Sequence, residues 1–421
     1  MQRRELLLGA AVASLGLLPL GRGAWAVVGE PPAAAPRRLI VVFLRGAADG
    51  LSIVVPYADP AYYQARSSIA LSRPGTEGGA LELDRRFGLH PALEPLMPLW
   101  QSGKLGFIHA SGSPDATRSH FDAQDYMESA TPGRKSTQDG WLNRLIGALP
   151  LPEGARATPT RAVSIGAVLP RIYAGNNQVA NIPSGAAATR PTQLDRPVVS
   201  QAFDKLYSTD DKISRAYQAS QQSRREVMGS MAPSELEREM MAANNGAPLP
   251  NGFPDDAVRL ATLMRNDARV QLAFMEVGGW DTHANQGAAS GQLANRLSPL
   301  GTGLAALATR LGPAFDDTVV LVMSEFGRTV RQNGNNGTDH GHGNVMWALG
   351  GRINGGKVLG QWPGLDASAL HEGRDLAITT DFRLVLAEVL ERHLLLPDAR
   401  LDAVLPQFGA NRASAPGLIR A

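Results

Sequence analysis

The sequence predicts an α/β protein with a central, mostly parallel sheet flanked by helices. Strongly apolar runs over 38–44, 271–277 and 318–323 have the length and composition of buried strands. Helical patterns over 255–268 and 290–311 alternate with the second and third of these runs. This alternation is typical of a doubly wound, largely parallel sheet. Acidic and imidazole residues directly follow these strands, which is where open α/β sheets place their functional sites.

The other elements follow in order along the chain. After the strand at 38–44 we expect a helix over 91–101, because Leu93, Leu96, Met97 and Trp100 share one face. Ser119 is expected to cap a helix that continues through Glu128. The remaining predicted elements are strands at 105–109, 161–168 and 344–351 and a late helix over 381–395.

The predicted domain spans 37–415, and a linker rich in alanine and proline, 27–36, precedes it. From about 201 to 250 the chain becomes polar, charged and helical in pattern. We interpret this segment as a helical insertion in the sheet domain, and we find no internal repeat.

Residues 1–26 have the features of an export signal. Arg3 and Arg4 precede an apolar stretch from Leu6 to Leu20, and Ala24-Trp25-Ala26 is a typical cleavage pattern. The stretch is shorter than the roughly 20 residues that span a bilayer. Paired arginines favour the twin-arginine (Tat) export machinery as a partner and a periplasmic or secreted location. The alternative is an ordinary secretory signal whose arginines are paired by chance.

Composition narrows the class of function. The whole chain has 41 basic and 39 acidic residues, and removing 1–26 removes three arginines and one glutamate, which leaves 38 of each sign. A formally neutral mature chain with no basic run predicts no nucleic-acid partner. No later segment is apolar enough for stable membrane insertion. The chain has no cysteine, so disulfides, a cysteine nucleophile and thiolate metal ligands are excluded.

Three short runs after predicted strands carry residues that bind metal ions. Carboxylates and neutral imidazoles are ligands for divalent cations, and GGWDTH, SEFGR and GTDHGHG supply Asp281, His283, Glu325, Asp339, His340 and His342. Asp49 follows the first strand in the same way. The sequence therefore predicts a site for one or two divalent ions, with Zn, Mn, Mg and Ca as candidates.

Spacing supports this site. In an extended segment the side chains at i and i+2 share a face, so Asp281 and His283 can hold one ion, and the same relation joins His340 and His342. The alternatives stay open: solvated loop side chains for these residues, an ion pair with Arg328 for Glu325, and a turn-stabilising role for Asp49. His90, His109, His371 and His393 are isolated and are expected to be structural.

A nucleophile is predicted at Ser119, at a helix N-terminus where free N–H groups favour an anion. A nearby divalent cation would lower the pKa of its hydroxyl. Arg118 and Arg45 are candidates to bind the oxygens of the group under attack. The alternatives are a plain N-cap for Ser119 and a ligand or orienting role for His120. No GxSxG motif is present, which disfavours a Ser-His-Asp esterase.

Long motifs resemble a family of exported proteins of unknown function, DUF1501. They are LRGAADGLSIVVPYADPAYY, GLHPALEPL, RSHFDAQDYMES, GGWDTHANQ, SEFGRTV and GTDHGHGNVMWALGG, and the resemblance covers nearly the whole mature chain. The family is similar, more remotely, to the alkaline phosphatase and sulfatase superfamily. That resemblance implies an alkaline-phosphatase-like fold with two metals at strand ends and a Ser, Thr or modified Cys nucleophile between them.

Carried over by position, the resemblance implies a first metal aspartate at Asp49 and a nucleophile at Ser119. Asp281 and His283 match a ligand pair, Glu325 matches a metal aspartate, and His340 matches the last metal histidine. Two departures stand out: the pair is two residues apart instead of four, and Phe326 replaces a ligand of the second metal. The Cys/Ser-x-Pro-x-Arg signature of formylglycine sulfatases is absent.

These observations predict an exported, metal-dependent hydrolase acting on a small-molecule or polymeric ester of phosphate or sulfate. Asp49, Asp281, His283, Glu325 and His340 are the expected metal ligands, and Ser119 is the expected nucleophile. Within this reading, a metal-assisted phosphodiesterase with water as nucleophile remains open. The alternative from another class is a non-catalytic periplasmic binding protein on a degenerate phosphatase-like fold.

Overall fold

The computed structural model describes residues 36–151, 158–185, 241–408 and 415–420, together with the backbone of two short strands nearer the N-terminus. The chain divides into two compact units, Met1–Pro36 and Arg37–Ala421. In the first unit, β1 (Leu17–Pro19) pairs antiparallel with β2 (Trp25–Val27). The rest of the predicted signal, 1–26, and residues 201–240 of the predicted insertion lie outside the described residues.

The second unit is built around a nine-stranded sheet in the order β13-β7-β12-β11-β3-β10-β8-β9, with β14 also paired to β7. The strands are β3 (Arg38–Leu44), β7 (Leu105–Gly112), β8 (Ala162–Ile165), β9 (Ala180–Ile182), β10 (Leu272–Val277), β11 (Thr318–Ser324), β12 (Asn344–Leu349), β13 (Val358–Leu359) and β14 (Thr380–Asp381). β12 is antiparallel to both of its neighbours, and every other pairing in the sheet is parallel. The predicted mostly parallel sheet is confirmed.

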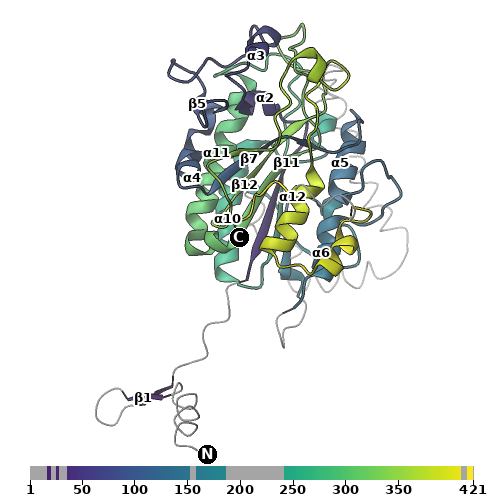
Figure 1. Ribbon diagram of the computed structural model, residues 1–421. Helices are drawn as coiled ribbons and strands as arrows, with labels where there is room; N and C mark the ends of the chain where they lie inside the picture. The colour runs from purple at the N-terminus through teal and green to yellow at the C-terminus, as the bar shows by residue number, and fades with distance from the viewer. Residues whose placement is uncertain are drawn as a thin grey trace, which may run out of the picture. The chain divides into compact units, whose positions relative to one another are not determined.

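Two hydrophobic cores, one on each face of the sheet, hold the helices against it (Figure 1). Alternate residues of β3 face opposite sides, so Val42 packs with one core and Val41 with the other. Residues of α4 (Met97–Gln101), α10 (Phe253–Asn266) and α11 (Gln292–Leu311) join the first core. Residues of α5 (His120–Ser129), α6 (Trp141–Ala148), α12 (Phe382–Glu388) and α13 (Leu401–Val404) join the second.

The predicted elements within the described residues are confirmed with small shifts at their ends. The helix expected over 91–101 is a 3₁₀ turn, Pro91–Leu96, followed by α4, and the late helix is α12 followed by a π-helical turn over Val389–His393. The sequence patterns did not predict α2 (Gly50–Ile53), α3 (Pro60–Ala65), α6, or the small sheet of β4 (Val54–Val55), β6 (Gly88–Leu89) and β5 (Leu81–Glu82).

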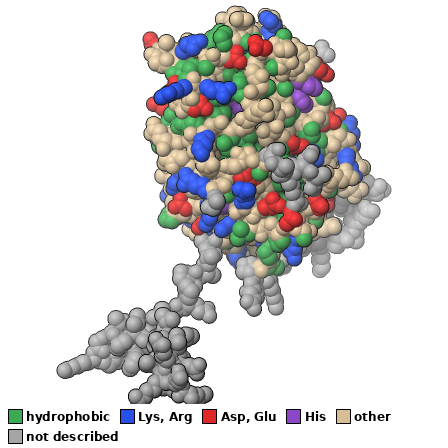
Figure 2. All heavy atoms as spheres, viewed as in Figure 1, with side chains coloured by type: hydrophobic (Ala, Val, Ile, Leu, Met, Phe, Trp, Pro, Cys, Tyr) green, Lys and Arg blue, Asp and Glu red, His purple; other side chains and the backbone are tan. Residues whose placement is uncertain are grey.

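Basic and acidic side chains are interspersed over the face of the molecule shown in Figure 2. Among the described residues, no helix combines the length and the apolar character needed to cross a bilayer.

Candidate metal centre

One edge of the sheet gathers the segments that carry the predicted site residues. Leu44, at the end of β3, is in register with Val277 of β10 and Ser324 of β11. The residues that follow these parallel strands therefore leave the sheet at the same edge. Because β12 is antiparallel to β11, the segment before Asn344 also lies at this edge. The N-terminus of α5 completes the site, since its first residue, His120, contacts Glu325.

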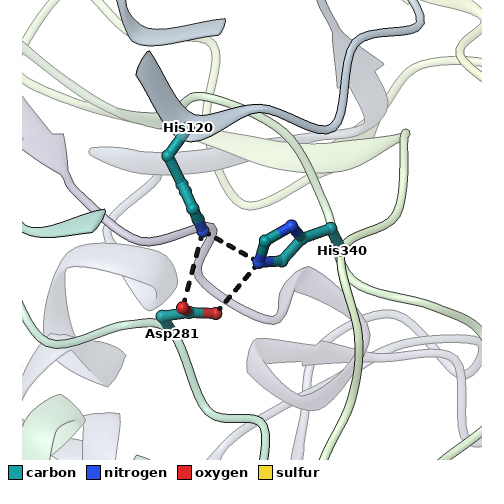
Figure 3. A group of neighbouring side chains, drawn as sticks. All are labelled: His120, Asp281 and His340. Carbon is teal, nitrogen blue, oxygen red and sulfur yellow. Dashed lines mark hydrogen bonds and ion pairs between the residues drawn. The ribbon is translucent and has the colours of Figure 1, made fainter. Parts of the chain in front are cut away.

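His120, Asp281 and His340 form a compact group with the geometry of metal ligands (Figure 3). One ligand atom from each lies within 4.8 Å of the other two. The Nε2 atoms of His120 and His340 are 2.9 Å apart. Both face the Asp281 carboxylate, at 3.6 Å from Oδ2 and 3.4 Å from Oδ1 respectively.

His283 adds a fourth ligand atom to this group. Its Nε2 lies 2.9 Å from Asp281 Oδ1 and 3.0 Å from His340 Nε2. The side chains of His283 and His340 are 13% and 16% exposed, against 1% for Asp281. Solvent and ligands therefore reach the centre from the side of His283 and His340.

Each of the three imidazoles is oriented by an acceptor on its other ring nitrogen. Nδ1 of His120 lies 2.8 Å from Glu325 Oε1, and Nδ1 of His283 lies 3.1 Å from Asp339 Oδ1. Nδ1 of His340 lies 2.9 Å from the backbone carbonyl oxygen of Arg118. Carboxylates and carbonyls only accept hydrogen bonds, so each Nδ1 carries the proton. In a neutral ring, Nε2 then keeps its lone pair for a metal ion.

A cation fits this arrangement. Three Nε2 atoms and the Asp281 carboxylate, which also binds Arg328, face one another, and a proton or a cation between them relieves the repulsion of their lone pairs. Asp281 Oδ2 is buried and has no hydrogen-bond partner among the described residues, although buried polar atoms are normally paired. Three imidazoles and one carboxylate are a donor set typical of zinc, and other divalent transition metals also accept it.

The electrostatics of the centre agree with this assignment. Burial alone would raise the pKa of the Asp281 carboxyl, but its contacts with the three imidazoles and the charge of Arg328 hold it well below its usual range. Burial alone would lower the pKa of His120, but the Asp281 carboxylate 3.6 Å away and the hydrogen bond to Glu325 raise it to about 9. With no metal ion bound, a proton on His120 therefore offsets one of the two carboxylate charges, and Arg328 pairs with the other at Asp281.

Phe326 forms an apolar wall beside the centre. Its ring centroid lies 4.8 Å from that of His120 and 5.3 Å from that of His340. It is buried and packs with Ala47 and Ala123. A phenyl ring supplies no ligand atom, so the position that the resemblance assigns to a ligand of a second metal is filled by an apolar side chain.

Glu325 and Asp339, both expected to be metal ligands, contact the histidines instead. Glu325 is fully buried and also accepts hydrogen bonds from the backbone N–H of Gly46 and from Gln124. Burial alone would raise its pKa, but the hydrogen bond to His120 lowers it to about 2. Asp339 accepts a hydrogen bond from Asn333 as well as from His283. The two carboxylates thus orient the histidines.

Asp49 and Arg45 form ion pairs with other buried side chains. Arg66 binds the Asp49 carboxylate with both of its terminal nitrogens, and Gln286 donates a third hydrogen bond to it. This supports the turn-stabilising alternative for Asp49 over a ligand role. Arg45 lies between Glu128 and Glu276, 2.8 Å from each. Both oxygens of Asp49 are therefore occupied, and the Arg45 guanidinium is held by two buried carboxylates.

Arg118 and Ser119 lie beside the centre at the start of α5. The Arg118 guanidinium is 2.7 Å from both Glu372 and Asp375, and its side chain remains about one-third exposed, at 32%. The Ser119 hydroxyl accepts a long hydrogen bond, 3.4 Å, from the backbone N–H of Asp122, as an N-cap does. The residue that reaches into the metal group is the next one, His120.

The structure separates His342 from His340, although their spacing suggests a shared face. The chain bends at His342, and its ring stacks on His371 with centroids 4.2 Å apart. The i, i+2 rule requires an extended backbone, which the bend removes. The same rule holds for Asp281 and His283, whose side chains are in contact.

The family model for DUF1501, described as a protein of unknown function, matches residues 86–405. The chain belongs to this family. The match includes His120, Asp281, His283 and His340, and therefore the whole candidate centre. A search of curated proteins found no match.

The solved structures to which the chain is similar include the following three, each 11% identical to it. The C-terminal periplasmic domain of EptC from Escherichia coli has a TM-score of 0.39, over 92% of this chain and 93% of that one. BT1596, a 2-O GAG sulfatase, has a TM-score of 0.40 over 89% and 72%. An alkaline phosphatase superfamily protein from Vibrio parahaemolyticus has a TM-score of 0.36 over 77% and 62%. Likenesses at this level assign no activity.

Proposed function

We propose that this protein is an exported hydrolase of phosphate or sulfate esters that uses one divalent metal ion, held by His120, Asp281, His283 and His340. One observation carries the proposal: three imidazole Nε2 atoms converge on the Asp281 carboxylate while an acceptor holds each Nδ1. Zn²⁺ is the favoured ion because of the three nitrogen ligands. A bound ion would supply a Lewis acid that polarises an ester oxygen.

The chain's own groups supply the rest of the site. Ser119 lies at the N-terminus of the ten-residue helix α5, next to the ligand His120. The free N–H groups at this helix end stabilise negative charge that develops on an attacked phosphoryl or sulfuryl group. Ser119 is the proposed nucleophile, with a water molecule as the alternative. Arg118, still partly exposed, is available to an oxygen of the same group.

Export is part of the proposal and is supported by the sequence of residues 1–26. Replacing both Arg3 and Arg4 by lysine is expected to block Tat-dependent export and leave the protein in the cytoplasm. Cell fractionation tests this, and unchanged periplasmic accumulation would favour the ordinary secretory route.

The first test is metal content, measured by mass spectrometry on the mature protein. We expect about one bound ion per chain in the wild type and almost none in His120→Ala or in the Asp281→Ala/His283→Ala double variant. His371→Ala is the matched control, because this histidine stacks on His342 outside the metal group, and it should keep the ion. A wild type that binds no metal after incubation with Zn²⁺, Mn²⁺, Mg²⁺ or Ca²⁺ would refute the proposal.

The second test separates the two nucleophiles. If Ser119 attacks the ester, Ser119→Ala should lower kcat on phosphate or sulfate esters by at least about 1,000-fold, as the loss of a catalytic nucleophile does. If Ser119 is only an N-cap, the variant should lose about 1 kcal/mol of unfolding free energy and keep its turnover. Measuring both quantities on the metal-loaded protein distinguishes these outcomes.

A non-catalytic binding protein is the second candidate, and Phe326 favours it. This side chain fills the place of a second-metal ligand with an apolar ring that packs on His120 and His340. Bound metal without turnover of any ester in a broad screen would support this reading.

A further inference from the structure

A cavity of about 460 Å³ adjoins the metal centre. It lies between the end of α3, the segment 329–332 that follows β11, and the segment 365–374. Its volume is within the range of roughly 300–1,000 Å³ that is typical of small-molecule sites. All of its lining residues are among those that the structure describes.

The wall of the cavity is also the support of the metal ligands. Asp339 lines the cavity, and its Oδ1 atom accepts from His283 Nδ1 at 3.1 Å. Arg374 lines it too and donates a hydrogen bond, 2.8 Å long, to the backbone carbonyl oxygen of His340. Thr329 in the same wall pairs with Asp339 through a backbone hydrogen bond of 2.9 Å. A molecule in the cavity would therefore contact Asp339 and Arg374, which in turn contact His283 and His340, two of the four proposed metal ligands.

The lining includes an arginine that no protein group within the described residues binds, beside the exposed carboxylate of Asp366. Arg331 is exposed, and within the described part of the chain its guanidinium has no hydrogen bond or ion pair. By contrast, the neighbouring Arg328 is fully buried and bound to Asp281 and Thr338. A free guanidinium at a cavity wall is suited to bind a carboxylate, sulfate or phosphate with two parallel hydrogen bonds.

The remaining groups suit a hydroxylated ligand. The side chains of Gln64 and Asp366 line the cavity and are exposed. An amide and a carboxylate together donate to and accept from hydroxyl groups. Val330, Leu365 and Leu370 add apolar surface that packs against carbon. The combination matches a sugar that carries an anionic group.

We propose that this cavity binds the alcohol part of the ester, that this part is a sugar bearing a second anionic group, and that Arg331 recognises that group. The inference rests on the proposed function, because it takes the reacting ester to lie at the metal centre. It adds the class of substrate and a specificity-determining residue.

The binding test uses chelator-treated full-length mature protein, so that no metal ion binds the phosphate and no turnover occurs. Calorimetric titration with glucose 6-phosphate and with glucose should show measurable binding of the phosphorylated sugar only. Arg331→Gln should weaken glucose 6-phosphate binding about tenfold or more, since a charge-assisted pair is lost. Arg85→Gln, which removes an exposed arginine between β5 and β6, should bind as the wild type does. Equal affinity of the wild type and Arg331→Gln would overturn the inference.

A second measurement uses the metal-loaded protein with glucose 1,6-bisphosphate and glucose 6-phosphate. Arg331→Gln should lower kcat/KM about tenfold for the bisphosphate, leave the monophosphate within about twofold, and keep its metal content. Loss of activity on both substrates to the same extent would overturn the inference. If the wild type holds no metal, the proposed function fails while the titration of chelator-treated protein still tests the cavity. If metal and turnover are present but binding is independent of Arg331, the substrate inference alone fails.

Discussion

The carboxylate of Glu325 sets the ring orientation and the tautomer of His120. It holds Nδ1 at 2.8 Å while the Nε2 atom faces Asp281 and His340. Fixing a ligand from its far side raises its basicity and removes the need to orient it when a metal binds. Glu325 is therefore expected to matter for affinity without touching the ion.

We predict that Glu325→Gln weakens Zn²⁺ binding about 10- to 100-fold, as the loss of comparable supporting groups does. The amide keeps the shape of the side chain but lacks the charge that strengthens the hydrogen bond to His120. Competition with a fluorescent chelator measures the dissociation constant. Asp316→Asn, which removes a carboxylate that is 60% exposed, is the control. Equal affinities for Glu325→Gln and the wild type would contradict the supporting role.

The grouping of these side chains was largely predictable from the sequence, but the separate contacts of each one were not. Asp281, His283 and His340 follow strands or precede one, and a rule about sheet edges is enough to place them. His120 was named only as an alternative to Ser119, because its helix reaches the site from a distant part of the chain. A carboxylate that contacts the metal position and one that contacts a histidine differ in position by about 3 Å, the length of one hydrogen bond. The spacing of residues in the sequence does not determine a difference of this size.

At the scale of elements, the segments after β11 and before β12 are locked together by backbone hydrogen bonds. Gly327 N–H donates to the carbonyl oxygen of His342, and Gly341 N–H donates to that of Gly327, both at 2.8 Å. A Cβ atom at Gly327 would lie 1.8 Å from the carbonyl oxygen of Gly343. This close approach holds His340 in place and leaves no room for a side chain.

Gly327→Ala is accordingly predicted to lower the unfolding free energy by about 3 kcal/mol, as forced overpacking does, and to reduce metal content. Gly334 lies in the same excursion, and a Cβ atom there meets nothing within 4 Å. Gly334→Ala should stay within about 0.5 kcal/mol of the wild type. Urea denaturation of both variants tests the pair. Similar losses in the two would show that the close approach is unimportant.

Patterns in the sequence predicted the long elements and missed the short ones. β3, β10 and β11 are continuous apolar runs, and α11 has the 3.6-residue period of a long amphipathic helix, so each has a clear pattern. The two-residue strands β4, β5 and β6 are too short to have one. The role of Asp49 was missed for this reason. Its partner Arg66 follows helix α3, which was not predicted, and the position of Asp49 after a strand does not indicate this ion pair.

At the scale of the whole molecule, buried histidines link folding stability to pH. His90 Nε2 contacts the carbonyl oxygen of Ala288, and His109 Nε2 contacts that of Val54, while each Nδ1 accepts a backbone N–H. Both rings are therefore neutral, with the proton on Nε2. Burial lowers the pKa of each from 6.5 to about 4. Protonation of Nδ1 would place its new N–H against the backbone N–H that it now accepts, so that two donors would face each other.

Because these pKa values are lower in the folded protein, the unfolded chain binds more protons between pH 6.5 and pH 4. Stability present at neutral pH is then lost as the pH falls through this window, by about 2 kcal/mol per histidine between pH 7 and pH 5. Urea denaturation at the two pH values measures the loss. His109→Gln should be less stable at pH 7 but should lose about 2 kcal/mol less on acidification. An unchanged pH dependence in this variant would rule out the contribution of His109.

The reversed direction of β12 has a consequence for how the protein can diversify. The excursion 325–343 starts and ends at one edge of the sheet, because an antiparallel pair needs no crossover. Closing a longer loop costs only about 0.6 kcal/mol for each doubling of its length. Insertions near Gly334, where a Cβ atom would meet nothing within 4 Å, can therefore accumulate without disturbing strand register, and the length of this loop can vary with the substrate.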